Sequence, residues 1–365
     1  MNLHAEHPSH RLADSTYLRA CRGQMHAHVP VWFQRQAGRS LPEYHELRRE
    51  GSILDTIRIP ELAAEITLQP IRRYKVDAAI LYSDIVVPAE CVGFGVDVKP
   101  GVGPVIENPF ERRADLDRLR PLEPETDTAH VLDTIKILAG ELDVPLIGFA
   151  GAPFTVASYL VEGKPSRDYA KTKALMLDDP ALWHDLMERL TDLAVASMRS
   201  QVVAGASAVQ LFDSWAGALS EADYRTMVLP HSTRVIAEVS ELGVPTAHFG
   251  VGTGELLAAF ADSGADVVGV DWRIPLSVAR QRTGNRVALQ GNLDPAVCLA
   301  QWPQVEKTVR RILNDNGDHP GYVFNLGHGV LPQTNPDILQ QVVELVHAEG
   351  QVAELPRAQP ARPHP

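Results

Sequence analysis

The stretch DPALWHDLMERLTDLAVASMRSQVVAGASAVQLFD, residues 179–213, predicts one helix followed by one buried strand. Asp179 can cap the helix, Pro180 suits its first position, and leucines recur on one face. Gly205 follows the last turn, and the continuous apolar run 208–213 is typical of a strand that is covered on both faces. A helix that leads directly into such a strand is the repeating unit of a parallel α/β sheet.

Apolar runs of strand length recur along the chain, separated by segments that are long enough for crossover helices. The runs are 29–35, 78–83, 145–150, 208–213, 245–250, 266–271, 287–291 and 322–326. They predict an α/β fold, a single-domain (β/α)₈ TIM barrel with an active-site cleft at the C-terminal ends of the strands. A doubly wound open sheet is the alternative, because the number of strands alone does not close a barrel.

The barrel is predicted to occupy residues 15–350, since no linker or change of composition divides this region. Residues 1–14 are polar and residues 351–365 are rich in proline, so both ends are predicted to be disordered tails. The histidines near the start are interpreted as solvated surface rather than as a metal site, because their spacing is irregular. They are His4, His7, His10 and His26.

Composition excludes several classes of protein. The 365 residues carry a formal net charge of −12, which disfavours binding to nucleic-acid phosphates. No apolar run approaches the ~20 residues that span a bilayer, and the first residues lack the apolar stretch of a signal peptide. The cysteines, Cys21, Cys91 and Cys298, lie far apart without a CxxC motif, which favours a reducing compartment. We therefore expect a cytoplasmic enzyme with neither a membrane nor a nucleic-acid partner.

Polar side chains follow the predicted strands at the ends that meet in a barrel. They are Arg35 and Arg39 after the first run, Asp84 after the second, Tyr159 beyond the third, Ser214 after the fourth and His328 after the last. Because the carboxyl ends of parallel strands lie together, we expect these side chains to line one site. Two guanidinium groups favour a ligand that carries several carboxylates or phosphates.

Most of these residues also have a purely structural interpretation. The arginines could form ion pairs with nearby acids such as Glu43. Asp84 and Ser214 could cap the segments that follow them, and Tyr159 could be a core aromatic residue. His328 differs, because glycines on both sides bring the backbone close to a neighbour, and this favours a functional role for the imidazole.

One glycine-rich loop imitates a nucleotide-binding motif. Gly250-Val251-Gly252-Thr253-Gly254-Glu255 follows a predicted strand and opens a helix, as a dinucleotide-binding loop does. Glu255 stands where that motif needs its third glycine, and its charge would repel a pyrophosphate. We interpret the loop as a tight turn between strand and helix. The absence of a GxxxxGK[ST] sequence excludes a P-loop.

The motifs at the strand ends are similar to those of the uroporphyrinogen decarboxylase family. Residues 30–44, PVWFQRQAGRSLPEY, resemble one signature of the family, and residues 148–155, GFAGAPFT, resemble a second. Further matches occur, in order, at 210–217, 290–295 and 325–329. Gln34 and Ser40 depart from the Met and Tyr that the family often has there. Both flank the arginines rather than replace them, so the departures concern local packing.

The resemblance implies a homodimeric barrel enzyme without a cofactor or a metal. The reaction that it implies removes CO₂ from the four acetate side chains of uroporphyrinogen III and gives coproporphyrinogen III. The ligand-contacting positions that it implies are Arg35, Gln36, Ala37, Gly38, Arg39, Asp84, Tyr159, Ser214 and His328. Asp84 and Arg35 are the expected catalytic residues. An ionised Asp84 accepts pyrrole N–H groups and stabilises positive charge on the reacting ring, and Arg35 binds carboxylate and is a candidate for proton transfer.

Two other functions are compatible with a related barrel. A zinc- or corrinoid-type methyltransferase needs soft thiolate ligands close to a histidine. Here the candidate histidine is His248, and no cysteine lies nearer to it in the sequence than Cys298. A non-catalytic tetrapyrrole-binding protein would bind the same substrate without releasing CO₂. That function would require losses at Asp84 or at the arginines, and the sequence retains them.

Overall fold

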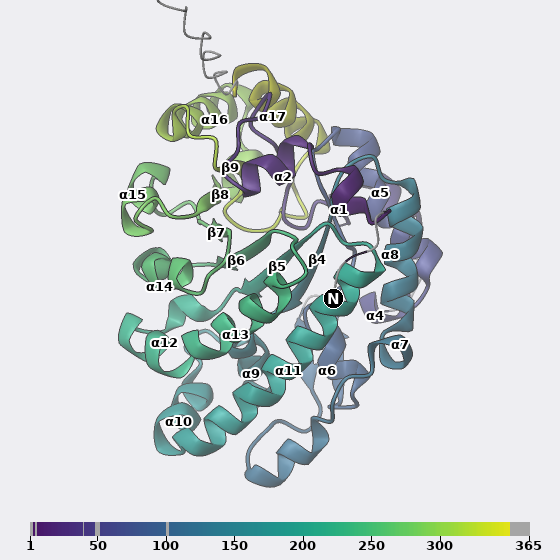
Figure 1. Cartoon of the computed structure of the whole chain (residues 1–365), viewed down its shortest axis with the longest axis vertical. Coiled ribbons are helices and arrows are strands. Elements are labelled where there is room, and N and C mark those ends of the chain that lie inside the picture. The colour runs from purple at the N-terminus through teal and green to yellow at the C-terminus, as the bar shows by residue number, and fades with distance from the viewer. Residues whose placement is uncertain (1–2, 4–5, 39, 48–51, 100–101, 351–365) are drawn as a thin grey trace, which may run out of the picture.

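The computed structural model describes residues 3, 6–38, 40–47, 52–99 and 102–350 (Figure 1). Helices surround a central group of strands in this part of the chain. The strands are β1 (Ala79–Ile80), β2 (Val96–Lys99), β3 (Gly103–Ile106), β4 (Leu146–Gly151), β5 (Ala208–Asp213), β6 (Thr246–Gly250), β7 (Val267–Gly269), β8 (Ala288–Leu293) and β9 (Tyr322–Leu326).

The helices range from single turns to α11, which has 25 residues. They are α1 (Pro8–Arg11), α2 (Thr16–Cys21), α3 (Pro42–Leu47), α4 (Ile53–Ile57), α5 (Pro60–Tyr74), α6 (Val87–Cys91), α7 (Pro124–Asp127), α8 (Ala129–Glu141), α9 (Pro153–Glu162), α10 (Ala170–Asp178), α11 (Pro180–Ala204), α12 (Glu221–Met227), α13 (Leu229–Ser240), α14 (Leu257–Asp262), α15 (Leu276–Arg282), α16 (Trp302–Asn316) and α17 (Pro336–Glu349). Among the described residues, no helix is both long enough and apolar enough to cross a membrane.

One parallel sheet of seven strands, in the order β1-β4-β5-β6-β7-β8-β9, forms the centre of the described structure. Within this sheet, each strand pairs with the strand of the same sheet that follows it in the sequence. Helices such as α11, α13 and α16 lie on the outside of the sheet (Figure 1). β4, β6 and β9 are buried along their whole length, as expected for strands covered on both faces. The predicted apolar runs from residue 78 onward therefore coincide with β1 and β4–β9, which confirms a parallel α/β fold.

The first predicted strand, residues 29–35, forms a single bridge, Val31 with Phe324 of β9, rather than a full strand. The N–H of Trp32 donates to the Phe324 carbonyl at 3.3 Å, and the N–H of Phe324 donates to the Pro30 carbonyl at 2.8 Å. On its other side, the Val31 carbonyl accepts the N–H of Asp77, just before β1, at 2.8 Å. The segment thus lies between the two edge strands of the sheet. Its ladder is short because Pro30 has no N–H to donate.

The helix predicted from residue 179 is confirmed as α11. The Asp179 carboxylate accepts the N–H of Leu182 at 2.9 Å, and Pro180 is the first helical residue. Gly205 ends the helix at φ 135°, a conformation that side-chain-bearing residues rarely adopt. In Figure 1 α11 lies along the outside of β4 and β5, so the local sequence signals and the packing agree.

The glycine-rich loop after β6 is a tight turn, as predicted. Gly252 takes a left-handed φ of 71° and donates its N–H to the Asp271 carboxylate. A short 3₁₀ turn, Gly254–Leu256, then leads into α14. The Glu255 carboxylate, which stands where a dinucleotide-binding motif needs its third glycine, pairs with the Arg282 guanidinium at 2.9 Å.

An antiparallel hairpin of β2 and β3 was not predicted. Val96 pairs with Ile106 and Lys99 with Gly103. Each strand has only four residues, too few for an alternating pattern to stand out from its surroundings. The hairpin is anchored from outside, because the N–H of Ile106 donates to the carbonyl of Gly163, just after α9, at 2.8 Å.

The prediction of a disordered tail over residues 1–14 is wrong for the part that the structure describes. α1 lies within it, and the His7 imidazole hydrogen-bonds the Val202 carbonyl of α11 at 2.7 Å. His7 and His26 are only 7% and 8% exposed, so the interpretation of both as solvated surface is also wrong. Packing against α11 orders a polar segment, which composition alone cannot show. His4 and the predicted tail 351–365 lie outside the described residues.

Candidate active site

Arg35 lies where the segment 29–35 ends, beside the loop that follows β9. Its backbone is left-handed at φ 58°, and its side chain runs directly past Gly329, where a Cβ would come within 2.8 Å of the Arg35 Cγ. Two hydrogen bonds connect these loops. The N–H of Gln34 donates to the Asn325 side-chain oxygen, and the N–H of Val330 donates to the Gln34 carbonyl, both at 2.9 Å. Arg35 is therefore fixed against the carboxyl end of β9.

Asp84 and Arg35 both act on the phenol of Tyr159. Burial raises the pKa of Tyr159 well above its usual value, the Asp84 charge raises it further, and the Arg35 charge opposes the rise. Asp84 follows β1, and Tyr159 lies on α9, directly after β4. Three side chains that are far apart in the sequence are thus near enough, at the carboxyl edge of the sheet, for two of them to influence the third.

Tyr159 is held by aromatic neighbours. Its ring lies on the Trp215 indole with 3.8 Å between ring centroids, and Tyr169 contacts the same indole at 4.9 Å. Burial raises the pKa of Tyr169 to about 12, and Glu162 adds to the effect, so its phenol stays neutral. Neither Trp215 nor Tyr169 is among the predicted site residues. Trp215 lies beside Ser214 in a quoted motif, whereas nothing in the sequence around Tyr169 connects it with the site.

Ser214 is positioned by its buried neighbours. The Asp213 carboxylate accepts the Thr155 hydroxyl at 2.9 Å, and the same hydroxyl oxygen accepts the N–H of Trp215 at 3.3 Å. These bonds tie the end of β5 to the first turn of α9. The following 3₁₀ turn begins without a side-chain cap, so the capping interpretation of Ser214 is wrong. Within the described residues, the Ser214 hydroxyl makes no hydrogen bond.

The loop after β9 places His328 between two glycines with close contacts. A Cβ at Gly327 would approach the Trp272 backbone nitrogen to 2.7 Å, and one at Gly329 would meet Arg35. The expectation that these glycines allow a close backbone approach is therefore confirmed. The His328 Nδ1 accepts the N–H of Gly329 at 2.5 Å, which fixes the orientation of the half-buried ring.

The structure also decides some of the alternative interpretations. Glu43 pairs with Arg73 through two hydrogen bonds of 2.7 and 2.8 Å, rather than with Arg35. One oxygen of Asp84 accepts the N–H of Val86 at 3.1 Å, so this carboxylate does stabilise the turn before α6. That bond leaves the electrostatic effect of Asp84 on Tyr159 in place.

The arginine loop, residues 35–39, is only partly directed toward the site. The Gln36 side chain is 1% exposed and spans two backbone groups, the Phe33 N–H at 2.9 Å and the Ala78 carbonyl at 3.1 Å. Gln36 thus shapes the loop through its own hydrogen bonds. Ala37 is half-buried, and Gly38 takes a left-handed φ of 105° beside the Tyr44 ring. Arg39 lies outside the described residues.

Among the described residues, one cluster has the composition of a metal site, and it lies elsewhere. His28 and His347 each hydrogen-bond one oxygen of Asp77, at 2.9 and 2.7 Å. Asp77 precedes β1, so the cluster lies at the amino ends of the strands, opposite Asp84. His248 of β6 is stacked on Phe260, and its Nδ1 hydrogen-bonds the Ser263 hydroxyl at 3.1 Å.

The fold and this site define an α/β protein of parallel-sheet type with an acid, an arginine and a phenol at the carboxyl edge of the sheet. The family model described as uroporphyrinogen decarboxylase matches residues 12–349. The chain belongs to the uroporphyrinogen decarboxylase family. A uroporphyrinogen decarboxylase from Salinispora tropica is 59% identical, with 92% of this chain and 90% of the relative covered. One from Streptomyces griseus is 58% identical, with 93% of each covered.

Solved structures share the fold at much lower sequence identity. A methyltransferase from Methanosarcina mazei aligns with a TM-score of 0.75 and 20% identity, covering 94% of this chain and 98% of that one. A B12-independent methionine synthase from Shewanella sp. aligns with a TM-score of 0.56 and 14% identity, covering 89% and 97%. At these identities the likeness concerns the fold and says nothing about the activity of this chain.

Proposed function

We propose that this chain decarboxylates uroporphyrinogen III. In each of four steps an acetate side chain loses CO₂ and gains a proton, so that –CH₂–COO⁻ and H⁺ become –CH₃ and CO₂. The product is coproporphyrinogen III. The observation that carries the proposal is membership of the uroporphyrinogen decarboxylase family, with relatives of that name at 58–59% identity. The placement of Asp84 and Arg35 near Tyr159 supports it.

Asp84 is the proposed electrostatic stabiliser. Loss of CO₂ from an acetate arm needs an electron sink, and a pyrrole ring protonated at the neighbouring carbon provides one. Positive charge then develops on the ring in the transition state. A carboxylate held in place by its turn stabilises that charge more than it stabilises the neutral pyrrole of the ground state. Ionised Asp84 accepts hydrogen bonds only, so it also suits the pyrrole N–H groups.

The remaining site residues are proposed to bind the carboxylates of the substrate. Arg35 presents a planar guanidinium group, which matches a carboxylate through two parallel hydrogen bonds. Tyr159 of α9, Ser214 after β5 and His328 after β9 supply further hydrogen-bonding groups. Gln36, Ala37 and Gly38 contribute the shape and backbone of the arginine loop, and Arg39 remains a predicted second guanidinium. Arg35 is also the proposed route for the incoming proton, directly or through a water molecule.

We further propose that the segment 29–35 is the eighth strand of a closed (β/α)₈ barrel. Its hydrogen bonds to β9 and to the start of β1 support this proposal. So does a chain of buried side chains across the interior. The Trp32 indole N–H donates to the Gln290 oxygen at 3.0 Å, and the Gln290 amide donates to the Gln210 oxygen at 2.8 Å. Strands that lie three apart in the sheet meet in this way only if the sheet is curled. A single domain over residues 15–350 and a homodimer remain predictions.

The experiment that tests the function is anaerobic incubation of chelator-treated protein with uroporphyrinogen III, followed by mass analysis of the oxidised products. We expect a ladder of products from eight carboxyl groups down to four. The same protein with Asp84→Asn is the control for contaminating enzyme, and it should stay near the starting material. Unchanged substrate with folded wild-type protein would contradict decarboxylation, and bound but unreacted substrate would indicate a tetrapyrrole-binding protein instead.

A further inference from the structure

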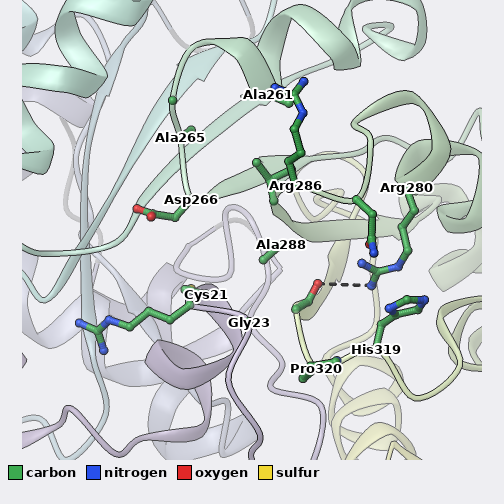
Figure 2. A pocket seen from close by; sticks show the side chains of 15 residues that line it. Cys21, Gly23, Ala261, Ala265, Asp266, Arg280, Arg286, Ala288, His319 and Pro320 are labelled. Carbon is green, nitrogen blue, oxygen red and sulfur yellow. Dashed lines mark hydrogen bonds between the residues drawn. The ribbon is translucent and has the colours of Figure 1, made fainter.

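A second cavity lies at the opposite end of the strands from Asp84 and Tyr159. Its lining includes Asp266, Ala288 and Gly321, which stand at the amino ends of β7, β8 and β9. Its volume, about 510 Å³, lies within the range of roughly 300–1,000 Å³ that is usual for small-molecule sites. None of the residues assigned to the decarboxylation lines it. The cavity is therefore separate from the candidate active site. Figure 2 shows the side chains that line it.

The buried guanidinium of Arg280 dominates one wall of this cavity. Arg280 is only 8% exposed, and its Nη2 donates to the Asn316 side-chain oxygen at 2.5 Å and to the Gly321 carbonyl at 3.3 Å. Its Nε has no hydrogen-bond partner, and no described carboxylate lies within ion-pair distance of the guanidinium. An arginine carries five N–H donors and a permanent charge, so burial without an anionic partner is unfavourable. Burial lowers the pKa of Arg280, and the charge of Asp315, which makes no ion pair with it, opposes this shift only in part.

The groups around Arg280 leave the cavity with an excess of positive charge. Figure 2 shows His319 beside Arg280, and burial together with the Arg280 charge lowers the pKa of this imidazole, so it adds a hydrogen-bonding group rather than a positive charge. Arg22 also lines the cavity, and Arg286 lines it while pairing with Asp262 at 2.8 Å.

The acidic and thiol groups of the lining do little to offset that charge. Asp266 is the one carboxylate of the described lining, and Figure 2 shows it away from Arg280. One of its oxygens already accepts the Thr246 N–H at 2.8 Å. Burial raises the pKa of the Cys21 thiol to about 12, so this group stays neutral. In a chain of net charge −12, a lining with three arginines and one carboxylate is a local excess of positive charge, even though Arg286 is paired with Asp262 outside the lining.

We propose that this cavity binds the phosphoryl group of a small molecule, with Arg280 and His319 as its main contacts. A phosphoryl group offers three acceptor oxygens and up to two negative charges, which matches a guanidinium with unused donors next to an imidazole. Inorganic phosphate and an organic phosphate ester share this chemistry. The cavity exceeds the volume of one phosphate ion, which favours the ester. The proposal is independent of the decarboxylation, because it uses none of the same residues.

Calorimetric titration at constant ionic strength tests the proposal on the full chain. The probes are inorganic phosphate, adenosine monophosphate and, as a monovalent carboxylate, acetate. We expect saturable 1:1 binding of a phosphate compound and no binding of acetate. Tighter binding of the nucleotide would identify an ester as the ligand class, and tighter binding of inorganic phosphate would identify the free ion. Absence of binding by both phosphates, or equally tight binding of acetate, would overturn the proposal.

Variants locate the binding site. Arg280→Gln should weaken phosphate binding about tenfold or more, as expected for the loss of a charge-assisted hydrogen bond. Arg310→Gln is the matched control, since it removes the same charge from an exposed arginine paired with Glu349, and it should bind as wild type does. If Arg280→Gln does not fold, His319→Asn, at an exposed position, provides the test instead. Its affinity for phosphate should fall about threefold or more. Binding that depends on Arg35 and is unaffected by the cavity variants would place the ligand in the active site and refute the inference.

Discussion

At the scale of single residues, the backbone of Arg35 determines where its guanidinium can lie. A left-handed conformation at a residue with a Cβ costs about 1–2 kcal/mol, so the surroundings must compensate for it. The hydrogen bonds of Gln34 with Asn325 and Val330 fix the chain just before Arg35. Gly329 then leaves room for the arginine side chain to pass. One guanidinium is thus positioned by groups that are not among the predicted ligand-contacting residues.

The glycine at 329 provides a direct test of this positioning. In Gly329→Ala the new methyl group would meet the Cγ and Nε of Arg35, and a flexible side chain gives way more easily than backbone. We therefore expect a folded protein in which Arg35 is displaced. kcat/KM for uroporphyrinogen III should fall about 10- to 100-fold, in line with a misplaced charge contact. Steady-state kinetics together with thermal unfolding separates this effect from a loss of stability.

A second glycine serves as the control. Gly140 lies inside α8, and a Cβ there has nothing within 4 Å. Gly140→Ala should raise the free energy of unfolding by about 0.5–1 kcal/mol, because alanine favours a helix interior, and it should leave kcat/KM unchanged. Unaltered activity of Gly329→Ala would contradict the placement of Arg35 in the site.

In the proposed reaction, Asp84 is the residue whose charge stabilises the transition state. Asp84→Asn keeps the shape of the side chain and removes its negative charge, so kcat should fall about 100- to 1,000-fold while KM changes far less. Asp97→Asn is a matched control, since its carboxylate also accepts a nearby backbone N–H, that of Val98, but lies on the exposed face of β2. Full activity of Asp84→Asn would eliminate the proposed electrostatic role.

At the scale of secondary-structure elements, α11 shows how local signals and packing reinforce each other. Its first turn carries a side-chain cap and a proline, and its end carries a glycine. Between them one face is buried against the sheet, and the amide of Gln201 on that face spans the edge of β4. Its oxygen accepts the Phe149 N–H at 2.8 Å, and its nitrogen donates to the Phe149 carbonyl at 2.9 Å. A single side chain therefore fixes the helix relative to the strand that leads to Tyr159.

The N-terminal cap of α11 gives a prediction about stability. Asp179→Ala removes the acceptor of the Leu182 N–H and should lower the free energy of unfolding by about 1 kcal/mol. Asp178→Ala, one residue earlier on the exposed side of α10, should change it by less than about 0.5 kcal/mol. Urea unfolding of the two variants and the wild type measures both values. Equal destabilisation by the two variants would show that charge, rather than the cap, is responsible.

At the scale of the whole molecule, Asp77 connects three distant parts of the chain. Its carboxylate accepts the N–H of Val31 at 2.7 Å, together with hydrogen bonds from His28 and from His347 of α17. Burial alone would raise the pKa of Asp77, and the hydrogen bonds from the histidines and the Val31 N–H outweigh it, so that the pKa lies below its usual value. This acid therefore holds the segment 29–35 and the last described helix against the start of β1.

The pKa of Asp77 gives a pH dependence with a definite sign. Because its folded-state pKa is lowered, its contribution to stability is complete above the unfolded value of about 3.9 and is lost as the pH falls through the folded-state pKa. Asp77→Asn should lower the free energy of unfolding by about 2–3 kcal/mol at pH 7, and its deficit relative to wild type should shrink in acid. Asp143→Asn, at a fully exposed carboxylate, is the control and should show neither effect. A deficit that stays constant down to pH 3 would contradict the assignment.

The sequence by itself determined the order of strands and helices, because runs such as 208–213 and the cap at Asp179 are local signals. It also identified the residue types at the carboxyl ends of the strands, since Arg35, Asp84 and Tyr159 follow apolar runs that the fold must bury. The motifs were sufficient to indicate the family. In these respects chain order and short-range periodicity carry the information, and both can be read without a partner in space.

Only the tertiary structure decided which of these residues meet and how they are held. Glu43 pairs with Arg73, Gln36 hydrogen-bonds the Ala78 carbonyl, and His7 hydrogen-bonds the Val202 carbonyl of α11. Each of these partners is far away in the sequence. The cavity around Arg280 likewise arises where three strand ends and a helix converge. A hydrogen bond or a buried charge depends on distances across the fold, and those distances are fixed only when the whole chain has packed.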